Sequence, residues 1–345
     1  MNRLLAVLPF WLLLTVAAGA AEINPLFQSQ DPLQITLTGP FRTIDRERDK
    51  DQEYEGTVSY TTADGQVTTL DTSYEVRGNY RLRKDVCRFS QLWLDLRRGQ
   101  LPGTLFAGQN RLKLVVQCRP RDRYADLVVK EHLAYRMFLQ LSDTGFDARL
   151  VNVTYDYSDD EGESRTHLGV IIEHKDTVAQ RAGGENVDLN RISLTDLEPR
   201  QATLVGLFMM MIGNTDFSLA AGPADDECCH NAKLLEIEGR YVPIPYDFDA
   251  SGFVDASYAA DPNPSFGLRS NRQRLFRGYC IHNDYVSDAL PVFREEKEAI
   301  LSLIRQSGLS SPREIRSSVG YIEDFYEIIN DPGEIEDEIL DDCRG

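Results

Sequence analysis

Long apolar segments are scarce in this sequence. The one stretch of any length covers residues 4–17, behind Arg3, and it is followed by Ala18, Gly19 and Ala20. A short basic start, an apolar run below the length of a membrane span and a row of small residues are typical of a secretory signal peptide. We therefore expect residues 1–21 to be removed and the mature chain to be exported, to a periplasm or out of the cell, without stable membrane insertion.

Positive charge is also in deficit. The chain has 37 Lys and Arg residues against 55 Asp and Glu residues, so its formal net charge is −18. A nucleic-acid-binding surface needs an excess of basic residues, and this composition argues against nucleic acid as a partner. Many of the acidic residues lie in the C-terminal tail, between residues 323 and 342, which we interpret as a solvated helix face.

Two familiar site signatures are absent as well. No Gly-x-Ser-x-Gly pentapeptide occurs, which argues against a serine hydrolase. No Cys-x-x-Cys pair occurs either, so disulfides of an oxidising compartment explain the six cysteines better than zinc does. Cys87 and Cys118 both lie in strand-like segments and are the expected pair. Because adjacent cysteines rarely bond each other, we expect Cys228 or Cys229 to pair with Cys280.

Hydrophobic periodicity divides the chain into two halves. Residues 22–175 are rich in strand patterns and include an Asp64-Gly65 hairpin signal in what we take for an antiparallel sheet. The expected strands are residues 33–38, 57–61, 66–70, 73–77, 92–96, 111–117, 148–155 and 167–173. The expected helices are residues 127–141, 204–212, 289–306 and 312–330. The sequence thus predicts an α+β fold in which residues 176–345 are mainly helical, hold one hairpin at 233–244 and end in the acidic tail.

Two carboxylates stand two residues apart directly after a strand-like run. They are Asp247 and Asp249, within residues 242–252. Side chains at positions i and i+2 of an extended segment point to the same side. Two anions do not converge without a cation or a shared proton. We therefore expect a divalent metal at a phosphoryl site here, and the simpler alternatives are a turn cap or a structural calcium site.

Polar residues that suit phosphoryl transfer occur in a fixed order along the chain. Asp216 lies on a loop after a buried helix, Asn231 precedes a strand, and Asp247 follows the paired strand. Kinase-like enzymes use one such Asp to accept the hydroxyl proton, and an Asn and a second Asp to hold the metal. Lys113 on a strand and Glu131 on the next helix would pair, with the lysine reaching the phosphates. The simpler alternatives are an exposed strand lysine and a helix-surface charge.

Several segments resemble the spore-coat CotH kinase family, in matching order, between about residue 33 and residue 255. In chain order they are Val76-Arg77-Gly78-Asn79, Glu131-His132-Leu133-Ala134-Tyr135-Arg136-Met137-Phe138, His167-Leu168-Gly169-Val170-Ile171-Ile172-Glu173, Gly213-Asn214-Thr215-Asp216 and Asp247-Phe248-Asp249.

The resemblance implies an atypical protein-kinase-like two-lobe fold. It also implies metal-dependent transfer of a phosphoryl or nucleotidyl group from ATP, with Mg²⁺ or Mn²⁺, to a hydroxyl of a secreted or envelope protein. Asp216 would be the catalytic-loop acid, and Asn231 and Asp247 would be metal ligands with Asp249 in support. Arg77 and Glu173, together with Lys113, are the expected nucleotide-binding residues, and the simpler alternative for Arg77 is an anchor for a turn.

The competing interpretation is a non-catalytic module, either pseudokinase-like or stabilised by calcium. It is favoured by the absence of a Gly-rich phosphate loop and by Phe217-Ser218 after Asp216. Glycoside cleavage between Asp216 and Asp247 is a further alternative, but it leaves Asn231 unexplained. His230 has no partner at a typical spacing, so we interpret it as a satisfied polar histidine and not as a ligand or base.

Overall fold

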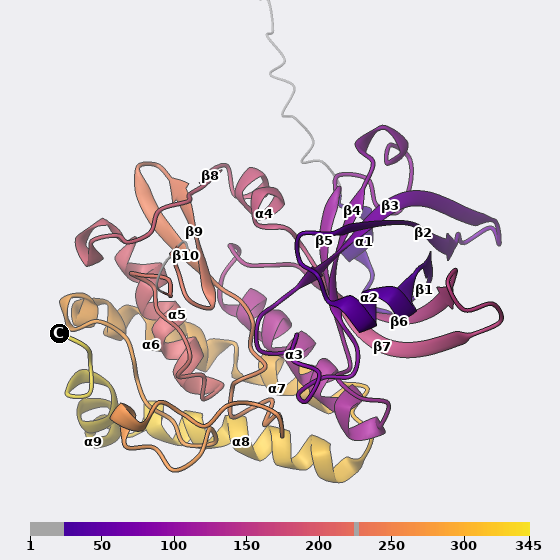
Figure 1. Cartoon of the computed structure of the whole chain (residues 1–345). Helices are drawn as coiled ribbons and strands as arrows, with labels where there is room; N and C mark the ends of the chain where they lie inside the picture. The colour runs from indigo at the N-terminus through magenta and orange to yellow at the C-terminus, as the bar shows by residue number, and fades with distance from the viewer. Residues whose placement is uncertain (1–23, 224–227) are drawn as a thin grey trace, which may run out of the picture.

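The computed structural model describes residues 24–223 and 228–345 (Figure 1). The predicted signal peptide, residues 1–21, lies outside the described residues. The strands are β1 Leu33–Gly39, β2 Glu53–Thr61, β3 Val67–Arg77, β4 Gln91–Leu96, β5 Arg111–Val116, β6 Ala148–Tyr157, β7 Ser164–Ile172, β8 Glu185–Asn186, β9 Ala232–Ile237 and β10 Arg240–Pro245. The α-helices are α1 Pro25–Gln28, α2 Phe41–Glu47, α3 Asp122–Leu141, α4 Lys175–Arg181, α5 Pro199–Met211, α6 Val286–Glu295, α7 Lys297–Arg305, α8 Pro312–Asn330 and α9 Pro332–Ile335.

Seven of the strands form a closed barrel in the order β1-β2-β3-β4-β5-β7-β6. Every pairing is antiparallel except that of β1 with β6, which is parallel and runs from Leu33–Val151 to Gly39–Tyr157. The remaining strands make a small sheet in the order β10-β9-β8. In Figure 1 the barrel lies at one end of the molecule and the small sheet with α5 and α6 lies at the other.

The closed barrel overturns the predicted kinase-like two-lobe fold. The sequence patterns found strands in the right regions of the β-rich half, but they divided β3 into two strands, at 66–70 and 73–77. They also predicted an antiparallel sheet and not a closed, mixed barrel. The barrel is closed by the pairing of β1 with β6. These two strands are separated by more than half of residues 22–175. Local alternation reveals which residues form strands, whereas it carries no signal for a pairing across such a distance.

Local chemistry explains why the barrel strands turn and pack closely. Gly65 takes a φ of 83° in the turn between β2 and β3, as the Asp64-Gly65 signal predicted. Inside the barrel, Gly56 leaves room for Tyr74, because a Cβ at Gly56 would lie 2.3 Å from the Tyr74 ring. The Tyr74 hydroxyl donates to the carbonyl oxygen of Thr57 at 2.6 Å. A large side chain with its polar end satisfied therefore fills this part of the barrel.

Helix α3 connects the barrel to the helical part of the molecule. It packs against β6 and β7 on one side and against α7 on another, and Figure 1 shows it between the two regions. Helix α5 is the centre of the second region. All ten of its residues from Ala202 to Met211 are buried, so the apolar run at 204–212 is a core helix, as predicted.

The other helical predictions hold with one change. The helix expected at 289–306 is two helices, α6 and α7, which meet at Glu296. The acidic tail forms α9 and one π-helical segment, Glu336–Leu340, and most of its carboxylates are exposed, as a solvated helix face requires. Within residues 24–223 and 228–345, no helix is both long and apolar enough to span a membrane.

Three disulfides join the cysteines. Cys87–Cys118 confirms the expected pair. The prediction that Cys228 or Cys229 pairs with Cys280 is wrong, since Cys228 and Cys229 bond each other and Cys280 bonds Cys343. The pairing of Cys280 follows from the fold, because backbone hydrogen bonds hold the C-terminal segment beside it: the Cys280 N–H donates to the Arg344 carbonyl oxygen at 2.9 Å.

Candidate functional site

Asp216 lies on a tight loop that begins where α5 ends. Gly213 ends the helix with a φ of 63°, and the N–H of Asn214 donates to the carbonyl oxygen of Met209 at 2.8 Å. The buried Asn214 side chain then accepts a hydrogen bond from the Asp216 N–H at 2.9 Å. Arg277 closes the loop from outside, because its guanidinium donates to the Phe217 carbonyl oxygen at 2.9 Å and also to that of Thr215. The predicted helix end at Gly213-Asn214 is confirmed.

The Asp216 carboxylate is open to solvent and has two polar neighbours. His230 Nε2 lies 2.7 Å from Oδ1, and Asn231 Nδ2 donates to Oδ2 at 3.1 Å. The Asp216 side chain is 56% exposed, so a solute can reach it. The hydrogen bond that His230 donates to Asp216 raises the pKa of His230, although partial burial of the ring opposes the rise. Asp216 and His230 therefore form an acid–base pair at an accessible position.

The β9–β10 hairpin brings Asn231 next to the paired aspartates. Asn231 directly precedes β9, and Pro245 at the end of β10 pairs with Ala232. The N–H of Tyr246 donates to the Asn231 carbonyl oxygen at 3.2 Å. Asp247 then takes a left-handed φ of 61°, and its N–H donates to the hydroxyl of Tyr135 on α3 at 3.0 Å. Helix α3 thus holds the backbone of Asp247.

A buried arginine, Arg81, is the cation on which three carboxylates converge. It lies in the loop between β3 and β4, and its side chain is 7% exposed. Its Nη2 lies 2.9 Å from Asp247 Oδ1, its Nε lies 3.1 Å from Asp249 Oδ2, and its Nη1 lies 3.3 Å from Glu131 Oε2. Asp247 and Asp249 do converge, as the sequence predicted, and a side chain of the chain itself lies between them.

The surrounding charges separate the acidities of the two aspartates. Burial alone would raise the pKa of Asp247, but the cations Lys113, Arg81 and Arg77 outweigh it and hold that pKa well below its usual range. Burial raises the pKa of Asp249 to about 7 despite Arg81, and the negative charge of Asp247 contributes to the rise. Asp247 is therefore the firmly ionised member of the pair, and Asp249 is the one that holds a proton more readily.

Lys113 is buried on β5, which excludes the alternative of an exposed strand lysine. Its Nζ lies 3.9 Å from Asp247 Oδ2 and 4.5 Å from the centre of the Tyr246 ring. Within the described part of the chain this Nζ donates no hydrogen bond. Burial, with help from the nearby charge of Arg77, lowers the pKa of Lys113 to about 7. Such an ammonium group gains from any anion that comes within reach.

The expected pair of Lys113 with Glu131 is absent, because Glu131 bonds Arg81. Glu131 is buried on α3 and not a helix-surface charge. Arg77, at the end of β3, stacks on Trp93, with its guanidinium carbon 5.4 Å from the ring centre, and its Nε has no hydrogen-bond partner among the described residues. It therefore does not anchor a turn through Nε. Burial lowers its pKa.

These residues line one cleft with two connected recesses. The cleft has a volume of about 630 Å³, and five of the predicted site residues line it: Arg77, Asp216, Asn231, Asp247 and Asp249. A smaller recess of about 250 Å³ shares Arg77 and Trp93 with the cleft and is lined by Lys113 and Glu173. The second recess, of about 490 Å³, shares Asp216 and His230 with the cleft.

Glu173 joins α4 to the loop before β6 at the wall of the small recess. It is 2% exposed, and its Oε2 accepts hydrogen bonds from Arg181 at 2.9 Å and from the Asp147 N–H at 3.2 Å. Burial raises its pKa, although Arg181 opposes the rise. Its other oxygen, Oε1, is buried without a hydrogen-bond partner among residues 24–223 and 228–345. That oxygen is an acceptor left without a partner beside the recess.

Of the predicted site residues, the structure brings all but Glu131 to the walls of the cleft and its recesses. Sequence reasoning missed Arg81, which lies four residues after Arg77 in the loop that follows β3, and it set aside His230. The partner of His230 is Asp216, fourteen positions earlier. Sequence spacing reveals residues that lie together on one helix or one turn. It does not reveal this pair, because Asp216 and His230 lie on two different loops.

The oxygen donors of the cleft suit a hard cation. Arg81 binds one oxygen each of Asp247 and Asp249, and Asn231, whose amide donates to Asp216, lines the same cleft. The described residues bring no three His, Cys, Asp or Glu side chains together for a metal. Mg²⁺ commonly binds through one or two carboxylates, with water and substrate phosphates in the remaining positions. The donor set therefore fits Mg²⁺ or Mn²⁺ bound together with a phosphorylated substrate.

No protein-family model and no curated protein matches the sequence. The likeness to CotH kinases therefore rests on the motifs alone and stays a prediction.

Proposed function

We propose that the protein is an exported phosphotransferase that moves a phosphoryl group from ATP to a hydroxyl of a secreted or envelope protein. One observation carries the proposal. The accessible Asp216–His230 pair lies where a cleft with buried cations meets a second recess. ATP, the phosphoryl donor, would lie in the cleft and the acceptor hydroxyl in the recess, and the two would meet at Asp216. Function follows from such a site and not from the fold that holds it.

The cations of the barrel would bind the donor. Lys113 and Arg77 are buried beside the cleft, and each has a nitrogen without a hydrogen-bond partner in the described chain. Charged nitrogens form short, strong hydrogen bonds to phosphate oxygens. The Trp93 ring and the unpartnered Glu173 Oε1 are in the adjoining recess, which supports placing the base of the nucleotide there.

The carboxylates of the cleft would act on the metal and on the acceptor. Asn231 and Asp247, with Asp249 in support, would hold Mg²⁺ or Mn²⁺, which neutralises phosphate charge when bound. Asp216 would accept the proton of the acceptor hydroxyl. The hydrogen bond from His230 orients the Asp216 carboxylate. Asp247 is ionised at neutral pH and can therefore bind the metal as an anion.

The test is label transfer from γ-labelled ATP with Mn²⁺ or Mg²⁺, first to the protein itself and to a generic hydroxyl acceptor. We expect label with the unaltered protein, loss in Asp216→Ala and Asp247→Ala, and no loss in Asp51→Ala, a matched exposed aspartate outside the cleft. Absence of label under all conditions, with every variant folded, would overturn the proposal.

A second function, a non-catalytic binding module, is favoured by one specific contact. Arg81 already occupies Asp247 and Asp249, so these carboxylates have a cation without any metal. Thermal shifts separate the two functions. Stabilisation that requires ATP and Mn²⁺ together supports the enzyme, and stabilisation by Ca²⁺ alone supports the module. A ligand at about one hundred times its Kd adds roughly 2.7 kcal/mol, which such a shift resolves.

A further inference from the structure

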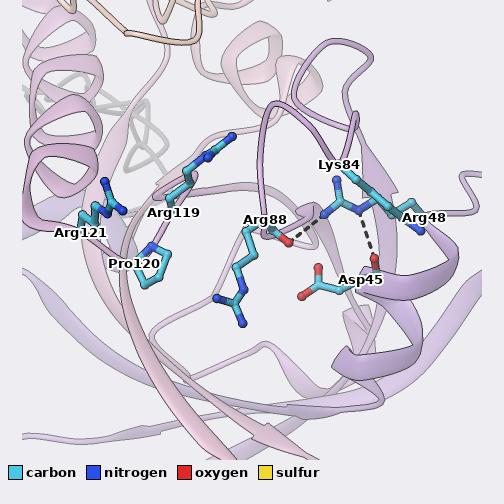
Figure 2. Close-up of a pocket in the computed structure, with 7 residues that line it drawn as sticks. All are labelled: Asp45, Arg48, Lys84, Arg88, Arg119, Pro120 and Arg121. Atoms are coloured by element: carbon cyan, nitrogen blue, oxygen red, sulfur yellow. Dashed lines mark hydrogen bonds between the residues drawn. The ribbon is translucent and has the colours of Figure 1, made fainter.

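A second pocket lies beside the barrel and shares none of its lining residues with the cleft (Figure 2). Its volume is about 540 Å³. Three segments form it: the end of α2 with the turn after it, the β3–β4 loop, and the link between β5 and α3. Its charged residues are Asp45, Arg48, Lys84, Arg88, Arg119 and Arg121. Five basic side chains thus gather against one carboxylate in a chain whose net charge is −18.

Arg48 builds the floor of this pocket. It follows α2 in a left-handed conformation with a φ of 54°, and it is 9% exposed. Its guanidinium donates to the carbonyl oxygens of Leu82 at 2.6 Å, Arg88 at 2.8 Å and Cys87 at 3.0 Å. Figure 2 shows the bonds to Arg88 and to the Asp45 carbonyl. Arg48 therefore fixes the β3–β4 loop against α2.

A disulfide fixes the opposite wall. Cys87 in the β3–β4 loop bonds Cys118 after β5, and the N–H of Arg88 donates to the Cys118 carbonyl oxygen at 2.9 Å. Arg88 and Arg119 are the next residues on the two strands of chain so joined. Their backbones are therefore held side by side, and Figure 2 shows their side chains extending from this wall in different directions.

The positive charge of the pocket exceeds the negative charge near it, although Asp45 attracts Arg48. None of the five basic side chains forms an ion pair within residues 24–223 and 228–345. Arg119 donates to the carbonyl oxygens of Asp85 and Val86, whereas Arg88 and Arg121 are exposed and their side chains donate no hydrogen bond to any described residue. The Asp45 carboxylate accepts from the Ser90 N–H at 2.8 Å, and burial raises its pKa.

We propose that this pocket binds a ligand with clustered phosphate or sulfate groups, in addition to the function proposed for the cleft. Guanidinium groups bind tetrahedral oxyanions through paired hydrogen bonds, which suits arginine better than lysine for this task. The volume of the pocket leaves room for several such groups. The acidic remainder of the surface repels polyanions, which favours their binding at a basic pocket such as this one.

The test is calorimetric titration of the purified protein with two probes, tripolyphosphate and sucrose octasulfate. The variant Arg88→Gln/Arg121→Gln removes the two arginines whose side chains donate no hydrogen bond to a described residue, and it leaves Arg48 and the disulfide in place. We expect at least tenfold weaker binding of the preferred probe. The control Arg313→Gln/Arg316→Gln removes two exposed arginines of α8 and changes the net charge equally, so it corrects for charge alone.

A third variant separates this pocket from the cleft. Lys113→Met weakens phosphate binding in the cleft, and we expect it to leave tripolyphosphate binding to the pocket unchanged. Preference for one probe identifies whether phosphate or sulfate groups are the ligand, and either preference supports the proposal. Binding of neither probe at low ionic strength would overturn it, as would equal loss in the pocket variant and in the α8 control.

Discussion

The two regions of the molecule contribute opposite charges to the cleft. The barrel supplies the cations Arg77, Arg81 and Lys113 from β3, the loop after it and β5. The loop after α5 supplies the anion Asp216, and the segment that directly follows the β9–β10 hairpin supplies Asp247 and Asp249. Buried charges of one sign are costly alone. The comparison shows that the buried charges of each region are neutralised by those of the other. The candidate site therefore lies where the two regions meet.

The largest effect should come from removing the cation that joins the two regions. Arg81→Met leaves Glu131, Asp247 and Asp249 without their shared partner. Losing one partner of a buried ion pair costs roughly 3–5 kcal/mol, so we expect the free energy of unfolding to fall by about that amount in urea denaturation. Arg83→Met is the matched control, because its pair with Asp85 is exposed. Equal losses in both variants would show that the regions do not depend on Arg81.

The next effect is a pH dependence that arises in the barrel. The pKa of Lys113 falls from 10.5 to about 7 on folding, so between these values the unfolded chain binds more protons. Stability therefore rises with pH in this window, by at most about 1.4 kcal/mol per pH unit. We expect the difference in unfolding free energy between the unaltered protein and Lys113→Met to increase from pH 7 to pH 10.5. A difference that does not vary with pH would contradict the burial of a charged lysine.

A smaller effect tests the bond from α3 to the anionic segment. Tyr135→Phe removes the acceptor of the Asp247 N–H and should cost about 1 kcal/mol of unfolding free energy, the typical value of one hydrogen bond. Tyr80→Phe, on an exposed tyrosine, should cost little. If the two variants lose the same amount, the left-handed backbone of Asp247 does not depend on this bond.

The smallest effect is a change in the pKa of His230, which lies beside Asp216. Asp216→Asn weakens the hydrogen bond that raises the pKa of His230, so that pKa should fall in an NMR titration. Because the folded pKa is raised, the stability gained from the pair is present in acid and is lost as pH rises through the folded pKa of His230. Asp261→Asn, in the neighbouring recess, should leave the pKa unchanged. An unchanged His230 pKa in Asp216→Asn would mean that the pair does not form in solution.

The sequence predicted what short-range chemistry controls. The Asp64-Gly65 turn, the end of α5 at Gly213 and the hairpin of β9 and β10 all follow from residues within a few positions of each other. The convergence of Asp247 and Asp249 was predicted from an extended segment, but Asp247 takes a left-handed φ of 61°. The two anions were expected to need a divalent metal, and the cation that lies between them in this structure is Arg81.

The features that the sequence did not predict depend on distant partners. The partners of Arg81 lie 50 and 166 positions away in Glu131 and Asp247, and β1 pairs with β6 across a similar distance. The sequence of a loop does not show whether its arginine is exposed or buried. The alternation of a strand likewise does not show which strand it pairs with. Only tertiary packing decides which state they take.

The parallel pairing of β1 with β6 has a consequence for how the chain folds. A chain emerges from the ribosome with its N-terminus first, so β1 can pair with β2 early, but its other edge stays unpaired until residues 148–157 are available. Such non-local closure is slow, and an unpaired edge invites association with another chain. Fragments that end before β6 should therefore aggregate, whereas those that extend past β7 can complete the barrel.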